Sequence, residues 1–267
     1  MYDDNFARYK ILPMIAGTYN NPRNCLQNTF KNYTFITQTT VGCDFINNDK
    51  CSGFVAVSND DKAVIIAFQG SITAMQIMLE GYETVFDEKE KFLGGGKVSR
   101  YFYISWSLVW NGGLRDGYFT AKNLYPNYEV WVTGHSLGGS MAAIAAANIV
   151  YHNYTQNDNI KLITFGEPRT GDKDFALSID QKIGYAYRVV HSHDPIPHLP
   201  LRDMLGYIHH KGEIFYDNNM SQGSPFTVCS SIDDNKQCSD KYINFNIFDH
   251  LFYFKDITLF GKLNCKQ

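Results

Sequence analysis

Short apolar runs rich in β-branched residues alternate with segments of helical length along most of this chain. Strands separated by helical crossovers are typical of a parallel sheet with helices packed on both faces. Such a sheet binds ligands at the carboxyl ends of its strands, so motifs at those ends are the first candidates for function. The expected strands are residues 54–58, 63–69, 129–133, 161–165, 185–191 and 213–216, and the expected helices are 98–110, 114–125 and 140–151.

One α/β domain is expected over residues 1–267, because no repeat, low-complexity tract or linker divides the sequence. The hydrophobic content of 44% is ample for a core, and the net charge of −3 without a long basic run argues against a nucleic-acid partner. No segment approaches the roughly 18 consecutive apolar residues of a membrane span. We expect a monomer without a transmembrane segment.

The cysteines indicate a disulfide-stapled, secreted protein. They are even in number, and neither a CxxC motif nor a zinc-finger spacing of Cys and His is present, so a structural metal site is not expected. Two pairs bracket short polar segments, which leaves one pair to join the two ends of the chain. The alternative is a set of free thiols in an intracellular protein. The predicted pairs are Cys43 with Cys51, Cys229 with Cys238 and Cys25 with Cys265.

The first residues lack the basic and apolar regions of a signal peptide. Together with the cysteine pattern, this predicts an extracellular protein whose signal peptide is absent from this version. The sequons at Asn32, Asn153 and Asn219 are no more frequent than chance predicts, so they leave glycosylation open.

The segment Gly134-His135-Ser136-Leu137-Gly138 follows an expected strand and precedes an Ala-rich helix. This Gly-x-Ser-x-Gly pattern is typical of the sharp strand-to-helix turn that projects a nucleophilic serine in α/β-hydrolases. Side chains at positions 134 and 138 would strike the neighbouring strand and helix. The alternative is a Gly-rich helix start that merely turns the chain. We predict that Ser136 is a nucleophile.

An acid and a base should follow the serine in that order. Asp194 ends the strand-like run 185–191 and is flanked by prolines, although Asp before Pro is also a common turn. Asp203 and Asp217 are weaker candidates because neither follows so clear a parallel strand.

His250 is the predicted base, because it follows the last expected strand on a loop that can return to the carboxyl edge of the sheet. A core or surface histidine beside an aromatic run is the alternative. Three other histidines are less suitable, since one is too close to Asp194 and two precede the last strand at its amino end. They are His198, His209 and His210.

An oxyanion formed by attack on an ester needs two donors about 3 Å away. The predicted donors are the backbone N–H of Leu137 and Ser71, which follows the strand 63–69; Ser71 could equally cap the next helix. The segment 72–81 places Ala74, Met75, Met78 and Leu79 on one helical face. It is either a lid over the active site or an ordinary core helix.

Several ordered motifs together resemble the class 3 lipases, which include secreted fungal triacylglycerol lipases and nematode relatives. They are FQGS (68–71), GHSLGG (134–139), FGEPRTG (165–171), HDPIPHLP (193–200) and DH (249–250), and the resemblance runs over almost the whole chain. It implies an α/β-hydrolase fold, a Ser136–Asp194–His250 triad, an oxyanion hole at Ser71 and Leu137, and a lid beginning near residue 72. The family usually has Arg where Gln69 stands, so an ion pair anchoring the lid hinge is not implied.

The sequence therefore predicts a carboxylic-ester hydrolase that acts through an acyl-enzyme, on long-chain acylglycerols at an oil–water interface, without a metal or organic cofactor. The rival within the same fold is an esterase or phospholipase acting on soluble or other esters. The rival from a different class is a secreted binding protein that has lost activity.

Overall fold

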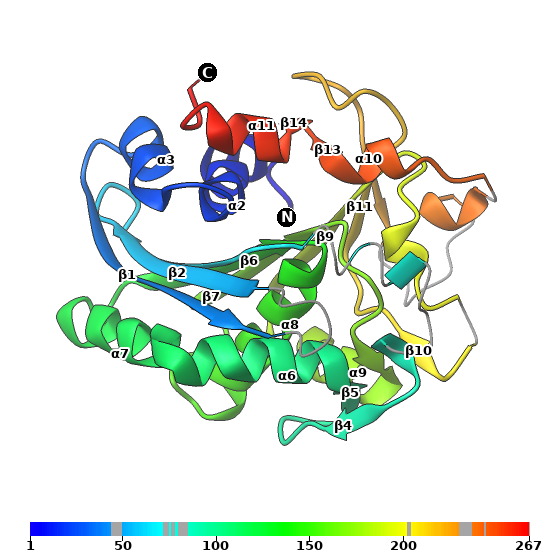
Figure 1. Ribbon diagram of the computed structural model, residues 1–267, viewed down its shortest axis with the longest axis horizontal. Helices are drawn as coiled ribbons and strands as arrows, with labels where there is room; N and C mark the ends of the chain where they lie inside the picture. The colour runs from blue at the N-terminus through cyan, green and yellow to red at the C-terminus, as the bar shows by residue number, and fades with distance from the viewer. Residues whose placement is uncertain are drawn as a thin grey trace.

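A mostly parallel eight-stranded sheet forms the centre of the computed structural model (Figure 1), within the residues it describes, which are 1–43, 50–71, 75, 78–79, 85–201, 204–229, 237–242 and 244–266. In spatial order the strands are β1 (Tyr33–Gly42), β2 (Lys50–Ser58), β3 (Ala63–Phe68), β6 (Glu129–His135), β7 (Ile160–Phe165), β9 (Tyr185–His191), β11 (Glu213–Tyr216) and β12 (Thr227–Cys229). The run from β3 to β11 is parallel, whereas β2 is antiparallel to both its neighbours and β12 to β11. The predicted α/β class is confirmed.

Helices cover both faces of this sheet, and Figure 1 shows the two layers on opposite sides of it. The first layer holds both ends of the chain, and the second holds the crossover helices. The first consists of α1 (Asp4–Phe6), η1 (Ala7–Ile11), α2 (Leu12–Thr18), α3 (Pro22–Thr29) and α11 (Ile257–Lys262); the second consists of α6 (Arg100–Val109), η2 (Trp110–Leu114), α7 (Arg115–Leu124), α8 (Leu137–Tyr151) and α9 (Lys173–Lys182).

Two hydrophobic cores result, because successive side chains of a strand point to opposite faces. On β3, Val64 and Ile66 belong to the core beside α8, while Ala63 and Ile65 belong to the core beside α2. A strand buried on both faces reads as a continuous apolar run, which is why residues 63–68 were recognisable in the sequence.

Helix α8 lies between the sheet and α6 and is buried from Leu137 to Val150. A helix that is apolar all round is buried on all sides, and alanine side chains allow it to approach the sheet closely. The helix begins at Leu137, three residues before the expected start, so Ser136 immediately precedes its first turn.

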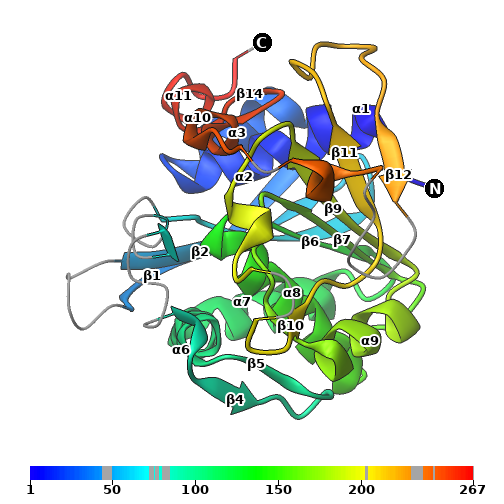
Figure 2. The same cartoon turned by 90° about the vertical axis from the view of Figure 1, so that its right-hand side faces the viewer.

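The helix predicted from residue 98 begins at Arg100 instead. Val98 belongs to a short strand, β5 (Lys97–Ser99), and Ser99 Oγ accepts a hydrogen bond from the Phe102 N–H at 3.4 Å, which caps the helix. With β5, a second small sheet contains β4 (Lys89–Lys91), β8 (Gly171–Asp172) and β10 (Tyr207–Ile208). Figure 2 shows β4 and β5 below α6, at the opposite end of the molecule from α11.

The chain ends in short elements that return to the sheet edge. They are η3 (Ile196–His198), η4 (Ser239–Lys241), α10 (Ile247–Leu251), β13 (Phe252–Tyr253) and β14 (Lys255–Asp256), the last two forming a two-stranded hairpin. No helix among the described residues is long and apolar enough to cross a membrane.

Three disulfides occur in the described residues. Cys25 of α3 is joined to Cys265, which ties the N-terminal layer to the end of the chain, and α3 and α11 lie in the same layer in Figure 1. The other bonds close short loops, one between β1 and β2 and one after β12. They are Cys43–Cys51 and Cys229–Cys238.

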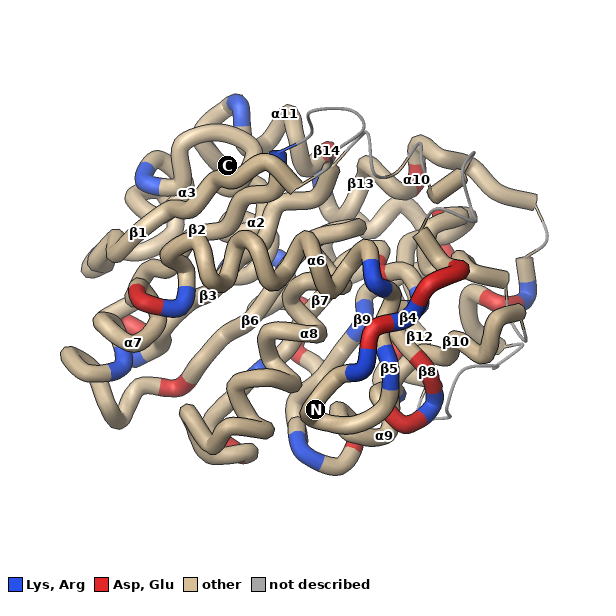
Figure 3. The backbone as a smooth tube through the Cα atoms, turned by 60° about the horizontal axis from the view of Figure 1, so that its bottom comes forward, with Lys and Arg blue, Asp and Glu red and all other residues tan. Residues whose placement is uncertain are grey.

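Charged residues of both signs lie close together on the small sheet that contains β4, β5 and β8 (Figure 3). Lys89, Glu90 and Lys91 follow one another on β4, and Asp172 and Lys173 do so at the start of α9. In this view Lys and Arg positions are interspersed with Asp and Glu positions along the backbone.

Candidate active site

Ser136 stands in a strained turn between β6 and α8. Its backbone has φ 57° and ψ −127°, a region that a residue with a side chain occupies only when its surroundings enforce it. Its N–H donates to the carbonyl of Phe165 on the neighbouring strand β7 at 3.0 Å. The turn is thus anchored to the neighbouring strand of the sheet.

The two glycines of the motif make this turn possible. A Cβ on Gly134 would overlap the carbonyl of Gly138, and a Cβ on Gly138 would overlap the carbonyl of Phe68 at the end of β3. These are the collisions with helix and strand that the sequence predicts. They mean that α8 starts in backbone contact with both β6 and β3.

Asp194 and His250 form a buried pair. Asp194 follows β9 and His250 lies on α10, and the His250 Nδ1 atom is 2.8 Å from Asp194 Oδ2 and 2.9 Å from Oδ1. Burial alone would raise the pKa of Asp194. The charge of His250 and hydrogen bonds from His250, Tyr253 and the Ile196 N–H outweigh burial and hold that pKa below its ordinary value. Asp194 is therefore ionised and oriented toward the imidazole.

Tyr253 is a member of this cluster that the sequence did not reveal. It lies on β13, fully buried, and its hydroxyl donates to Asp194 Oδ2 at 2.5 Å. Burial first, and then the negative charge of Asp194, raises the pKa of Tyr253 well above its ordinary value, so the hydroxyl keeps its proton and remains a donor. The only sequence signal was its place three residues after His250, within an aromatic run.

Gly166, directly after β7, leaves room for the pair. Its φ is +56°, and a Cβ there would lie 2.8 Å from the His250 ring and 2.9 Å from Asp194 Oδ2. Ser136 thus follows β6, Gly166 follows β7 and leaves room for the His250 ring, and Asp194 follows β9.

Ser136 and His250 line the same narrow, mainly apolar pocket. Ser136 Oγ and His250 Nε2 are both buried and have no hydrogen-bond partner among the described residues. The cavity volume is about 10 Å³, close to what one water molecule occupies. An ester substrate requires this pocket to widen. Its other lining residues are Tyr19, Ser71, Met75, His135, Leu251, Ile257 and Thr258.

The predicted oxyanion donors lie at the same edge. Leu137 opens α8, where backbone N–H groups and the positive end of the helix dipole favour an anion. Ser71 follows β3, which pairs in parallel with β6 so that Phe68 is opposite Gly134, and this register places the loop after β3 beside the serine turn. Ser71 contributes to the lining of the pocket.

The other acid candidates differ from Asp194 in their surroundings. Asp217 lies at the surface, where its carboxylate pairs with Lys241 and accepts from the Tyr242 hydroxyl. Asp203 is outside the described residues.

The other histidine candidates make contacts away from the pocket. His198 Nδ1 is 3.1 Å from Asp240 Oδ1, and His209 Nε2 is 2.7 Å from the carbonyl of Pro197. His210 Nδ1 is 2.9 Å from the carbonyl of its own neighbour, Lys211.

The predicted lid at 72–81 falls outside the described residues apart from Met75, Met78 and Leu79. Met75 and Met78 are buried, and Leu79 is 43% exposed. Met75 also lines the pocket that holds Ser136.

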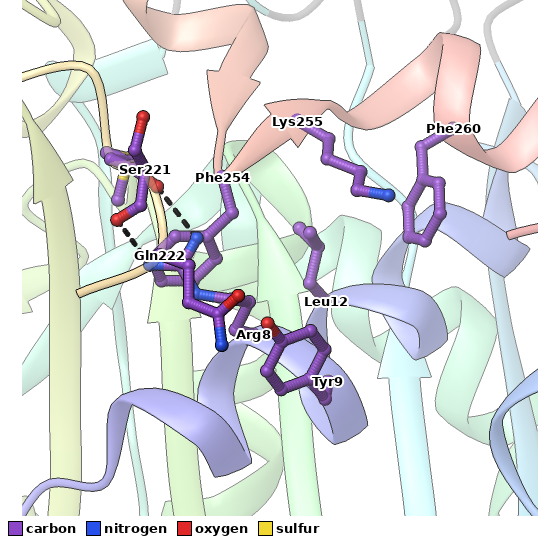
Figure 4. A pocket seen from close by; sticks show the side chains of 9 residues that line it. Arg8, Tyr9, Leu12, Ser221, Gln222, Phe254, Lys255 and Phe260 are labelled. Carbon is purple, nitrogen blue, oxygen red and sulfur yellow. Dashed lines mark hydrogen bonds between the residues drawn. The ribbon is translucent and has the colours of Figure 1, made fainter. Parts of the chain in front are cut away.

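A second cavity, of about 310 Å³, lies beneath the β13–β14 turn and contains none of the predicted site residues (Figure 4). Arg8 at its wall donates to the carbonyl of Met220 at 2.7 Å, pairs with Asp4 at 3.1 Å and stacks on the Phe254 ring at 4.0 Å. The guanidinium is thus fully engaged within the protein. It holds the N-terminal helices against the turn that follows Tyr253.

The strand-to-helix serine turn on a mostly parallel sheet, with a buried Asp–His pair on later loops, defines an α/β-hydrolase. The family model for lipase (class 3) matches residues 65–204. A lipase of Caenorhabditis elegans is 35% identical over 99% of this chain and 83% of its own length. The chain belongs to the class 3 lipase family, whose members are carboxylic ester hydrolases.

Two fungal proteins extend the comparison. A secreted mono- and diacylglycerol lipase of Fusarium solani is 32% identical over 77% of this chain, and the match spans 60% of that protein's length. The crystal structure of a lipase from Rhizopus microsporus var. chinensis matches with a TM-score of 0.79 and 26% identity, over 94% of this chain and 89% of the other.

Proposed function

We propose that Ser136, His250 and Asp194 hydrolyse carboxylic esters through an acyl-enzyme. The observation that carries this proposal is the pairing of His250 Nδ1 with Asp194 while His250 Nε2 and Ser136 Oγ, both without a partner among the described residues, line one pocket. Activation of a serine requires an imidazole whose Nδ1 atom is bound to a carboxylate and whose Nε2 atom is available to take the hydroxyl proton.

In the proposed reaction, Ser136 Oγ attacks the ester carbonyl carbon while His250 Nε2 takes the hydroxyl proton. The carbonyl electron pair moves onto oxygen, and the N–H groups of Leu137 and Ser71 stabilise the oxyanion. When the intermediate collapses, the C–O bond to the alcohol breaks and His250 returns the proton to the leaving oxygen. Water then repeats the sequence on the acyl-enzyme, which releases the acid and restores Ser136.

Asp194 acts in this scheme through His250. Because its pKa is held low by His250, Tyr253 and the Ile196 N–H, it remains a carboxylate while the imidazolium forms. It therefore stabilises the positive charge of His250 and fixes the tautomer with hydrogen on Nδ1.

We propose long-chain acylglycerols as substrates and an extracellular location. The apolar lining of the pocket by Met75, Leu251 and Ile257 suits an acyl chain, and the fungal relative is named as a secreted mono- and diacylglycerol lipase. The disulfides suit an oxidising compartment. We further propose that the segment 72–81 is a lid and that the enzyme acts as a monomer at an oil–water interface.

Two measurements test the proposed function. A fluorophosphonate probe should label the wild-type protein and not Ser136→Ala, and labelling that persists in the variant would exclude Ser136 as the nucleophile. Side-by-side hydrolysis of short- and long-chain glycerol esters should favour the long chains. A preference for soluble short or aromatic esters would assign the chain to the esterases, and absence of both labelling and turnover would make it an inactive binding protein.

The lid is tested by the response to an interface. Exposed methionine and leucine side chains cost roughly 25 cal/mol per Å² in water, a penalty that a droplet surface removes. Activity should therefore rise when the substrate passes its solubility limit, and Met78→Ser with Leu79→Ser should blunt the rise. A rate that saturates smoothly through that limit would exclude the lid.

A further inference from the structure

The residue that precedes the serine, His135, lies between two parts of the active site. Its Nε2 atom is 2.7 Å from the backbone carbonyl of His250, and its Nδ1 atom is 3.1 Å from the Tyr19 hydroxyl. The rings of His135 and His250 are in contact, with centroids 4.5 Å apart. Tyr19 is the residue directly after α2, so this contact joins the N-terminal layer to the base.

The direction of each hydrogen bond in this chain can be deduced. Burial, and then the charge of His250, lowers the pKa of His135 to about 3, so the ring is neutral and carries one hydrogen. The carbonyl of His250 can only accept, so that hydrogen is on Nε2, and Nδ1 must accept from Tyr19. Burial raises the pKa of Tyr19, so its hydroxyl keeps the proton that it donates.

Tyr19 has a second contact, on the oxyanion side. Its hydroxyl packs against the backbone of Gly70, immediately before Ser71. The close approach requires glycine, because a Cβ at position 70 would lie 2.5 Å from the Tyr19 hydroxyl and 2.6 Å from the His135 carbonyl. A hydrogen-bonded chain therefore runs from the Tyr19 hydroxyl to His135 Nδ1 and from His135 Nε2 to the His250 carbonyl, and Tyr19 at its start packs against Gly70.

We propose that Tyr19 and His135 are positioning residues that fix the oxyanion loop and the base relative to each other. The inference rests on the proposed function, since it assigns these contacts to the alignment of Ser71 and His250 around Ser136. Neither residue exchanges a proton with the substrate. His135 also keeps a neutral ring against His250, so that no second positive charge opposes the imidazolium formed during attack.

A hydrogen-bonded chain that aligns the two sides of the site should act through kcat. Tyr19→Phe keeps the ring that lines the pocket and removes only the hydroxyl, so kcat on a soluble short-chain ester should fall about tenfold with KM unchanged. His135→Leu removes both hydrogen bonds and should lower kcat about a hundredfold. His135→Gln offers an amide donor and a carbonyl acceptor and should retain most of the activity.

Three controls separate positioning from simple structural support. Tyr118→Phe also removes one tyrosine hydroxyl, which donates to the carbonyl of Tyr154 at a distance of 3.2 Å. Because this hydrogen bond does not involve the active site, the variant should leave kcat unchanged. Tyr19→Phe combined with His135→Leu should be no slower than His135→Leu alone, because the two residues act in one chain. Melting temperatures show that each variant is folded.

The proposal is overturned if folded Tyr19→Phe keeps the wild-type kcat, or if His135→Gln is no more active than His135→Leu. Should His135→Leu fail to fold, Tyr19→Phe and His135→Gln still decide the question. Ser136→Ala, measured in the same series, reports on the proposed function independently. If Ser136→Ala keeps turnover, the proposed function fails, whereas loss in Ser136→Ala with full activity in Tyr19→Phe overturns only the positioning chain.

Discussion

In the proposed active site, the serine turn and the segments that hold the proposed base are kept in place by different means. The turn at Ser136 is contiguous in sequence, and steric exclusion fixes it, since glycines 134 and 138 have backbone atoms where a side chain would be. The base side gathers Asp194, His250 and Tyr253 from separate segments through hydrogen bonds. A methyl group added at either glycine should therefore disrupt the turn and lower stability. Removal of one hydrogen-bonding atom from the Asp194–His250–Tyr253 cluster should lower kcat instead. The two kinds of change give distinguishable results.

Of the single changes that compare these two regions, the largest loss of kcat is expected when the negative charge of Asp194 is removed. Asp194→Asn should lower kcat roughly 10³- to 10⁴-fold, because the imidazolium loses its partner and His250 is no longer held in the required tautomer. Asp217→Asn, at an exposed carboxylate paired with Lys241, is the matched control and should leave kcat unchanged. Steady-state rates on a soluble ester decide it, and a loss smaller than about tenfold for Asp194→Asn would contradict the assigned role.

A single added methyl group tests the turn. Gly134→Ala should lower the free energy of unfolding by about 3 kcal/mol, because the new carbon overlaps the Gly138 carbonyl and backbone has to move. Gly184→Ala adds the same methyl where no atom lies within 4 Å and should change stability by less than about 0.5 kcal/mol. Urea denaturation measures both. Equal stability of the two variants would show that sterics do not fix the turn.

His135 should make the fold sensitive to acid. Burial lowers its pKa from the ordinary value of 6.5 to about 3 in the folded protein, so the unfolded chain binds the extra proton and stability falls as the pH drops below 6.5. Between pH 6.5 and about 4.5 this loss should be about 2 kcal/mol. His135→Gln should flatten the dependence over that range, as measured by urea denaturation at several pH values. If the free energy of unfolding depends on pH in the same way in wild type and His135→Gln, His135 is not buried in its neutral form.

The smallest effect is expected from Tyr253→Phe, which removes one of several hydrogen bonds to Asp194. We expect kcat to fall about threefold to tenfold, since one hydrogen bond to a charged group is lost while the His250 bonds remain. Tyr216→Phe removes another tyrosine hydroxyl, one that is bonded to Asp4 and not to Asp194 or His250, and should leave kcat unchanged. Equal rates in both variants would mean that Tyr253 serves packing alone.

The central strands and the serine turn were predictable because their signals are local. Apolar runs such as 63–68 mark strands buried on both faces, and the two glycines mark the turn by themselves. The edge strand β1 was not predicted, because Thr and Gln interrupt its apolar residues and most of the strand is half exposed or exposed. Helices α2 and α3 were not predicted either. They precede the alternation of strands and helices that marks the rest of the fold.

Tyr253 and Tyr19 could not be recognised from sequence, because their contacts join residues far apart in the chain. Tyr19 contacts His135, 116 positions away, and Tyr253 contacts Asp194, 59 positions away. A tyrosine inside an aromatic segment looks the same whether its hydroxyl bonds a buried carboxylate or faces solvent. Only the fold shows which buried hydroxyls have an active-site partner.

We propose that Ser136 and His250 act as one unit, and a double-mutant cycle tests this coupling. Ser136→Ala and His250→Ala should each lower kcat by several orders of magnitude, because the base has no role without the nucleophile and the hydroxyl is inert without the base. We expect the double variant to be little slower than either single variant. Losses that multiply in the double variant, or near-normal turnover of Ser136→Ala, would contradict it.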